Sequence, residues 1–213
     1  ASLETSLENN VGYMQSPSIH NHTLVFTSEG DLYLSYILDA KILPAMKLTT
    51  TIGNVLTPHI NPVYPHLIAF TATYTGRREV YLLDLANRRS SMRLTYTDSF
   101  HGMQHVVGWE NDGTSLLVST KNLEMGLPDN RLYKLWIFQK GSRPNSTSTA
   151  PYQSQTRMEP IPLSQAIDGV THNHCFYFTR TKQNSNTMRY VGGTVETLWK
   201  YCDSQTKAMP LTV

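Results

Sequence analysis

Residues 67–95, which read LIAFTATYTGRREVYLLDLANRRSSMRLT, decide the fold of this chain. They contain an apolar run that ends in a hydroxyl residue (Phe70-Thr71), then an aliphatic residue followed by an aromatic one (Val80-Tyr81), and then a short closing segment (Arg93-Leu94-Thr95). Short apolar runs that are bounded by turn residues are typical of β-strands. The stretch therefore predicts three consecutive strands, and the apolar segment before it predicts one more.

Together with the residues before it, this stretch predicts a meander of four antiparallel strands at 55–61, 67–74, 78–83 and 92–94. In the third strand Tyr81 and Leu83 alternate with Leu82 and Asp84, so their side chains point to opposite faces of the sheet. We expect one face in the core and the other partly exposed to water, as an antiparallel sheet allows.

The same pattern occurs four times along the chain. The apolar runs end at Phe26-Thr27, Phe70-Thr71, Val118-Ser119 and Phe178-Thr179. The aromatic pairs are Leu32-Tyr33, Val80-Tyr81, Leu132-Tyr133 and Leu198-Trp199. The closing segments are Lys47-Leu48-Thr49, Arg93-Leu94-Thr95, Pro162-Leu163-Ser164 and Pro210-Leu211-Thr212. Phe26 and Phe70 lie 44 residues apart, and Phe70 and Val118 lie 48 apart, which is close to the ~40 to 50 residues of one propeller blade.

The repeat predicts an all-β chain that folds as a partial β-propeller, with four blades of four antiparallel strands each. We expect an N-terminal extension at 1–12 and a propeller at 13–213, with blades at roughly 13–50, 55–96, 104–164 and 168–213. A single four-stranded sheet cannot bury both of its faces, so each blade needs neighbours that pack on it. Asn111-Asp112-Gly113 predicts a tight hairpin turn in the third blade.

The charge and hydropathy of the chain exclude two classes of partner. Its 18 Lys and Arg against 16 Asp and Glu leave a net charge of +2, which is too small for a nucleic-acid surface. No stretch approaches the ~18 apolar residues of a membrane helix, and residues 1–10 are polar and acidic, unlike a signal peptide. We expect no nucleic-acid partner, no membrane partner and a cytoplasmic location.

The cysteines agree with that location. Cys175 and Cys202 both belong to the fourth unit, on different predicted strands, and two cysteines in a chain of this length are no disulfide framework. We expect free thiols in a reducing compartment. Asn21-His22-Thr23 and Asn145-Ser146-Thr147 fit the glycosylation pattern, but such triplets arise often by chance and count only in a secreted protein.

Two histidine motifs occupy matching places in the first and fourth units. His20-Asn21-His22 and His172-Asn173-His174 each precede the second predicted strand. Alternate histidines on a strand point the same way and offer two imidazoles to a metal. The matching places in the other units, Asn61-Pro62 and Asn111-Asp112-Gly113, are turn residues. We favour hairpin turns over a metal site, because two imidazoles fall short of a zinc ligand set.

The remaining motifs do not form a set of catalytic residues. Ser204 and Lys207 have the spacing of some acyl-transfer enzymes, but they fall in a predicted turn, whereas that chemistry needs the serine at the start of a helix. Cys175 precedes Phe176 and Tyr177 and reads as a buried strand thiol, not a nucleophile. We expect no catalytic residue, no cofactor and no metal in this chain.

One loop is a candidate interaction site. Arg189, Tyr190, Gly192, Gly193 and Thr194 form it, just before the third strand of the fourth unit. The glycine pair permits a sharp turn or the close approach of another chain. A plain hairpin loop explains the same residues equally well.

Three segments carry a resemblance to a known family. The run 18–26 with Glu29-Gly30-Asp31-Leu32-Tyr33, the run 107–113, and the run 189–194 leading to Leu198-Trp199 resemble, in order, the first, third and fourth blades of the amino-terminal propeller of the tricorn protease family. The resemblance extends from about Tyr13 to the end of the chain. Its most specific element is Arg189-Tyr190-Val191-Gly192-Gly193-Thr194.

The resemblance implies a six-bladed propeller, of which four blades are present, in a serine peptidase that degrades peptides. The family's catalytic residues belong to later domains, so none is carried over to this chain. The role implied is a non-catalytic conduit for peptides or products and a scaffold for protein interaction. The implied partners are peptides, the rest of the parent polypeptide and the subunits of a homo-oligomer. The rivals are a stand-alone protein-binding propeller of the periplasmic translocation type, and an enzyme domain with a rim metal at the paired histidines.

Overall fold

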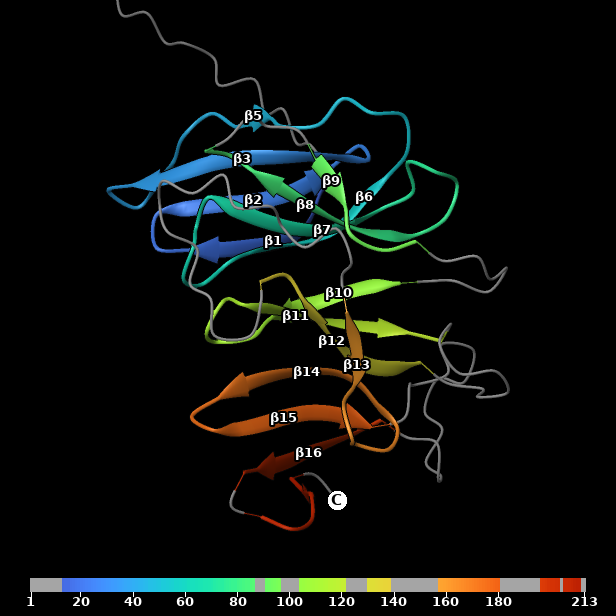
Figure 1. The fold of residues 1–213 in the computed structure, drawn as a ribbon. Coiled ribbons are helices and arrows are strands. Elements are labelled where there is room, and N and C mark those ends of the chain that lie inside the picture. The colour runs from blue at the N-terminus through green and yellow to red at the C-terminus, as the bar shows by residue number, and fades with distance from the viewer. Residues whose placement is uncertain are drawn as a thin grey trace, which may run out of the picture.

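The computed structural model describes residues 13–86, 91–96, 104–121, 130–138, 157–180, 196–203 and 205–211. Every regular element in these residues is a β-strand, and the strands form four sheets in chain order (Figure 1). No helix in the described part of the chain is long and apolar enough to cross a membrane. The all-β prediction, with four consecutive antiparallel meanders, is confirmed.

The first two sheets comprise β1 (Met14–His20), β2 (Thr23–Ser28), β3 (Asp31–Leu38), β4 (Lys41–Ile42), β5 (Met46–Lys47), β6 (Val55–Ile60), β7 (Leu67–Ala72), β8 (Glu79–Asp84) and β9 (Ser91–Arg93). The last two comprise β10 (His105–Trp109), β11 (Ser115–Thr120), β12 (Arg131–Trp136), β13 (Met158–Pro160), β14 (Ala166–His172), β15 (Cys175–Arg180), β16 (Thr197–Cys202) and β17 (Met209–Pro210). In the first sheet β4 and β5 both pair with β3, so two short strands share the outer position.

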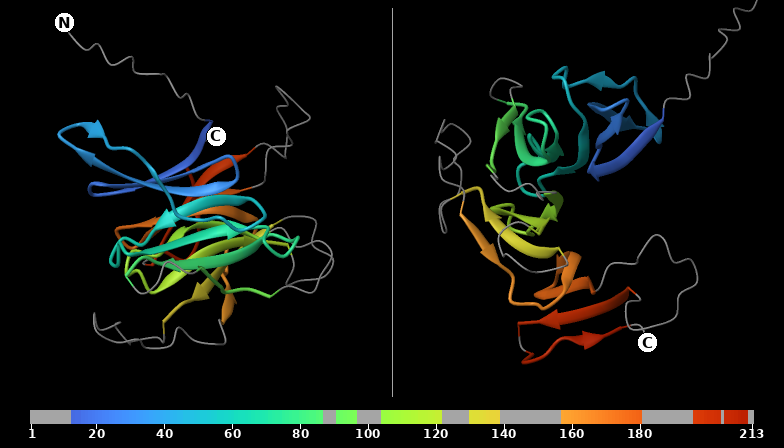
Figure 2. Two further views of the ribbon diagram at one scale, coloured as in Figure 1. Left: turned by 90° about the horizontal axis from the view of Figure 1, so that it is seen from above. Right: turned by 90° about the vertical axis from the view of Figure 1, so that its right-hand side faces the viewer.

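The sheets follow one another along an open arc, as blades of a propeller do (Figure 2). Contacts between sheets join consecutive blades: β6 contacts the first sheet, β10 the second and β14 the third. The first strands β1, β6, β10 and β14 therefore form the inner side of the arc. The later strands of each sheet step outward from it.

Neighbouring sheets cover both faces of the second sheet. All six residues of β8 are buried. Tyr81 and Leu83 pack toward the first sheet, in a core with Val25, whereas Leu82 packs toward the third sheet, in a core with Val106. The predicted alternation is correct, but the expectation of a partly exposed face is wrong for this blade, because a neighbouring sheet covers each side.

The closing segment of the third blade lies two residues earlier than predicted. The backbone amides of Leu48 and Leu94 donate to the carbonyl oxygens of Leu32 and Val80. In the third blade the amide that makes this bond, to Leu132, belongs to Ile161 and not to Leu163. Both residues are apolar and follow a proline, so the local sequence does not separate the two registers.

The two cysteines form a disulfide, so the prediction of free thiols is wrong. Cys175 and Cys202 are directly paired residues of the neighbouring strands β15 and β16. Their Cα atoms lie 4.0 Å apart and their sulfur atoms are bonded. Antiparallel pairing places facing side chains next to each other, and this register was not apparent from the spacing of the cysteines in the sequence.

Candidate functional site on the inner strands and between the blades

The first strands of three blades bring titratable side chains near one another. His59 lies on β6, His105 on β10 and Asp168 on β14. Burial and the nearby His105 lower the pKa of His59 to about 4, against a smaller opposing influence from Asp168. His59 is therefore a neutral imidazole at neutral pH. These three residues were not singled out by the sequence analysis, because they lie 46 and 63 residues apart along the chain.

The interface between the second and third blades is sealed. Trp109 at the end of β10 donates its indole N–H to the carbonyl oxygen of His59 at 2.9 Å. The fully buried Asn61 donates its amide to the carbonyl oxygen of Gly113, also across the interface, at 2.8 Å. Gly113 has a φ of 67°, and a Cβ there would lie 2.5 Å from Oδ1 of Asn61, so the predicted hairpin turn also lets the two blades meet closely.

The interface between the third and fourth blades is open at the same end. Strand pairing places Thr171 of β14 at the position that Trp109 has on β10. A threonine fills far less space than a tryptophan. The Thr171 hydroxyl donates to a carboxylate oxygen of Glu110 at 2.8 Å, and the other carboxylate oxygen lies 2.9 Å from Nζ of Lys134.

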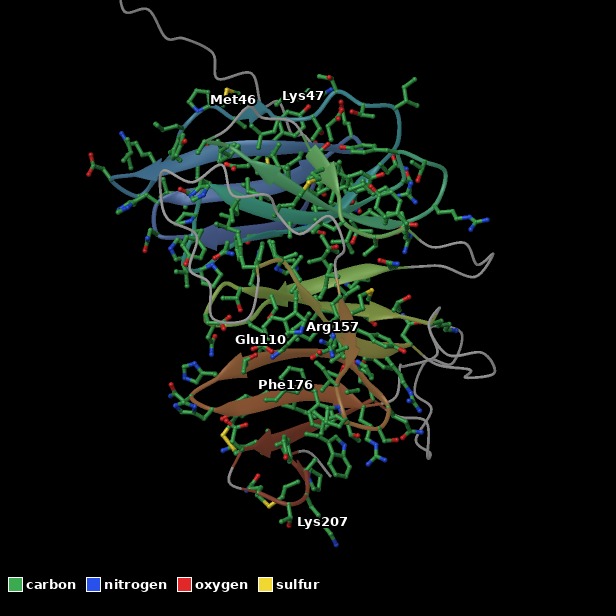
Figure 3. The ribbon with its side chains drawn as sticks, viewed as in Figure 1. Met46, Lys47, Glu110, Arg157, Phe176 and Lys207 are labelled. Atoms are coloured by element: carbon green, nitrogen blue, oxygen red, sulfur yellow. A yellow bond between two sulfur atoms is a disulfide. The ribbon has the colours of Figure 1, made fainter. Side chains whose placement is uncertain are left out.

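The space left there is a cleft of about 930 Å³. Its walls come from the β10–β11 turn, β12 and β13 on one side and from the β14–β15 turn and β16 on the other. Figure 3 labels Glu110 between the third and fourth sheets and Phe176 on the fourth sheet. The aromatic lining residues are Trp136, Phe176 and Tyr201, and the charged or titratable ones are Glu110, Asp112, Lys134, Glu159, His174 and Asp203.

A smaller hollow of about 310 Å³ lies between the first and second blades, beside the start of β6. Most of its lining is polar, including Gln15, Glu29, Asn54 and Arg78. Gly30 in this wall has a φ of 83°, and a Cβ there would lie 2.6 Å from Oδ1 of Asn54. The hollow thus adds a second polar surface near the inner strands.

The paired histidine motifs are hairpin turns, as predicted. His20 ends β1 and His172 ends β14, and Asn21 and Asn173 take positive φ angles of 51° and 48°. His174 is exposed at the rim of the large cleft, 3.9 Å from a carboxylate oxygen of Asp203. No group of three His, Cys, Asp or Glu side chains arranged to hold a metal ion occurs in the described parts of the chain.

Four predicted features lie outside the described residues. They are the N-terminal extension at 1–12, the Asn145-Ser146-Thr147 triplet, Ser204 and the candidate interaction loop. The role of that loop, formed by Arg189, Tyr190, Gly192, Gly193 and Thr194, stays a prediction. The large cleft was missed by the sequence analysis. Its one available signal was the presence of Thr171 where the third unit has Trp109.

Comparisons with known proteins agree with this fold. A family profile described as the tricorn protease N-terminal beta propeller domain matches residues 11–213. No match is found among curated proteins.

Solved structures with the same fold include a crystal structure of the tricorn protease, at 17% identity and a TM-score of 0.72, covering 95% of this chain and 18% of that one. TolB from Acinetobacter baumannii matches at 14% identity and a TM-score of 0.64, covering 94% of this chain and 44% of that one. A putative TolB from Agrobacterium tumefaciens matches at 15% identity and a TM-score of 0.64, covering 95% of this chain and 62% of that one.

The chain thus spans less than two thirds of each of these proteins, and identities this low establish the fold alone. The profile match extends over nearly the whole chain and over all four blades. This chain belongs to the family of tricorn protease N-terminal beta-propeller domains.

Proposed function

We propose that this chain is a non-catalytic propeller domain that passes peptides or products along its axis and serves as a scaffold for protein interaction. Its parent would be a tricorn-like serine peptidase with a six-bladed propeller, and its partners would be peptides, the rest of the parent polypeptide and further subunits of a homo-oligomer. The observation that supports this proposal is that polar side chains from consecutive inner strands lie near one another: His59, His105 and Asp168.

The inner surface suits a passage better than a tight binding site. Its strands come from separate blades, and each strand is fixed by the sheet behind it, so the surface is preformed. The neutral imidazole of His59 gives it a polar group without a fixed charge at neutral pH. Polar groups that form many weak contacts let a chain enter and leave.

Photo-crosslinking tests the conduit. Short peptides that carry a benzophenone and contain no lysine or arginine are irradiated with the protein, and the labelled residues are mapped by mass spectrometry. We expect labels on β6, β10 and β14. Labels confined to the outer strands β9 and β13, or labelling that an excess of unlabelled peptide does not reduce, would overturn the conduit.

The alternative is a stand-alone protein-binding propeller of the periplasmic translocation type. It is favoured by the fold shared with TolB and by the Cys175–Cys202 bond, because disulfides persist in oxidising compartments and are rare in the cytosol. A cytoplasmic location is the expectation under the first proposal. Alkylation of thiols in intact cells, followed by mass spectrometry, separates the two: trapped free thiols support the cytoplasm, and an oxidised pair supports the alternative.

A further inference from the structure

We propose that the cleft between the third and fourth blades binds a lysine or arginine side chain of an extended peptide. This inference deepens the proposed function and rests on it only in taking a peptide as the ligand. The cleft is distinct from the axis, because it opens between two sheets at their turn end. Its volume of about 930 Å³ falls in the range of ligand pockets, roughly 300 to 1,000 Å³.

The cleft exists because the fourth blade lacks the residue that closes the preceding interface. Trp109 spans the gap between the second and third blades and bonds to the backbone of β6. Thr171, at the same strand position, reaches only as far as Glu110. Phe176 and Tyr201 behind it belong to the core between the two sheets and supply an apolar floor.

The charge of the lining selects a cation. Glu110, Asp112, Glu159 and Asp203 contribute four carboxylates. The cations beside them are two: Lys134 in the lining, and Arg157, which lies 2.9 Å from a carboxylate oxygen of Glu159. Glu110 is held by Lys134 and Thr171. Asp203 is exposed at the rim, with 82% of its side-chain surface accessible, and one of its carboxylate oxygens lies 3.9 Å from the imidazole of His174. An anionic ligand would meet the excess of carboxylates and be repelled.

The contacts of Lys134 show how the cleft stabilises an ammonium group. Its Nζ lies 2.9 Å from Oε1 of Glu110 and 5.2 Å from the ring centroid of Trp136. A carboxylate and an aromatic face are the two groups that stabilise a partly desolvated cation. The rim carboxylate of Asp203 and the ring of Tyr201 offer the same pair on the opposite wall.

A peptide side chain fits this lining better than a free cation. The outer part of the cleft is formed by Pro160, Ile161, Pro162 and Leu163, which are suited to contact with methylene groups and backbone. Lysine and arginine place an apolar stem before a charged head. The stem would lie along the apolar segment and the head between the aromatic rings and carboxylates.

The test is titration calorimetry with blocked peptides. An acetylated and amidated alanine peptide with one central lysine is compared with matched peptides that carry norleucine or glutamate at that position. We expect the lysine peptide to bind at least about tenfold more tightly than the norleucine peptide, and less tightly at high salt, because exposed charges are screened. Equal affinities for lysine and norleucine would overturn the proposal.

Two variants locate the site. Asp203→Asn should weaken lysine-peptide binding roughly 1.5-fold to fivefold, as expected for one exposed charge pair, and the matched variant Asp39→Asn, on the exposed hairpin of the first blade, should not change it. Thr171→Trp should abolish binding by filling the cleft, provided that its thermal unfolding matches that of the wild type. Equal losses for Asp203→Asn and Asp39→Asn would refute the site even if Thr171→Trp fails to fold.

The outcomes are distinguishable from those of the conduit experiment. The crosslinking peptides contain no basic residue, and labels on β6, on β10 and on β14 before Thr171, which lines the cleft, report on the axis. If the lysine peptide binds but the axis is not labelled, the cleft proposal is supported and the conduit proposal is overturned. If the axis is labelled but the lysine peptide binds no better than the norleucine peptide, the conduit proposal is supported and the cleft proposal is overturned.

Discussion

At the level of single residues, His59 couples the stability of the protein to pH. Its pKa is about 4 in the folded state and near the ordinary value of about 6.5 when unfolded. Below pH 6.5 the unfolded state takes up a proton that the folded state does not bind. Stability is therefore complete above that pH and is lost as the pH falls toward 4. We expect His59 to account for at most about 2 kcal/mol of loss between about pH 7.5 and pH 5.

The measurement is urea unfolding at both pH values for the wild type and His59→Gln. The variant should lose the part of the pH dependence that belongs to this imidazole. His22→Gln, in an exposed hairpin turn, is the matched control and should keep the wild-type slope. An unchanged slope in His59→Gln would show that His59 titrates normally in the fold.

Thr95 is a second residue whose role is local. Its hydroxyl donates to the buried Glu79 and accepts a bond from the amide of Val80, while Arg93 also pairs with Glu79 at 3.0 Å. Thr95→Val removes both bonds of the hydroxyl, so we expect a loss of about 1–3 kcal/mol in unfolding free energy. Thr95→Ser keeps the hydroxyl and should lose clearly less. Guanidinium unfolding of the three proteins checks this, and identical losses in both variants would contradict it.

At the scale of elements, the same arrangement explains the closing segments. In the first blade Thr49 donates to Asp31 and accepts from the amide of Leu32, and Lys47 pairs with Asp31. The closing threonine thus ties the outer strand to the start of the third strand. Pro162 follows Ile161 in the third blade and has no hydroxyl, so that blade does without this connection.

The disulfide is the main covalent constraint on the fourth sheet. It joins β15 to β16 across a sequence separation of 27 residues. Closing a loop of that size in the unfolded chain stabilises the fold by about 3.5 kcal/mol in the chain-entropy estimate. We expect dithiothreitol to lower the midpoint of thermal unfolding of the wild type. The double variant with Cys175→Ala and Cys202→Ala should melt at the lower temperature and ignore the reductant. Two alkylatable thiols in the unreduced protein would contradict the bond.

At the scale of the whole molecule, the open arc leaves the far side of the fourth sheet without a neighbouring sheet in the described residues. Val170, Leu198 and Met209 lie there, with exposed fractions of 59%, 38% and 49%. Exposed apolar faces favour association, so we expect this chain to self-associate as its concentration rises.

Sedimentation velocity over a concentration series measures this association. Val170→Lys and Leu198→Lys should each weaken it, because a charge on this face has to be desolvated on contact. Ile52→Lys, in a loop where the wild-type side chain is 94% exposed, should not. A monomer at every concentration would show that the face does not drive self-association.

The sequence by itself was sufficient for the strands and their order. Apolar runs such as 67–72 and 115–120 are read from neighbouring residues, and the side-chain alternation of a strand is a local property of the backbone. The repeat then predicted four similar sheets, because each unit contains its own turns. The failures at Ile161 and at Cys175–Cys202 concern register, which depends on how two strands slide past each other and not on either strand alone.

What only the tertiary structure decided is how neighbouring blades meet. Trp109 and Thr171 occupy the same place in two repeats, but one closes an interface and the other leaves a cleft, depending on what the adjacent sheet presents to each. The low pKa of His59 has the same origin, because burial in the assembled fold and His105 from the third blade lower it, against a smaller opposing influence of Asp168 from the fourth blade. Periodicity records which face of a strand is apolar, whereas packing volume and electrostatic interaction act through space between residues far apart in the chain.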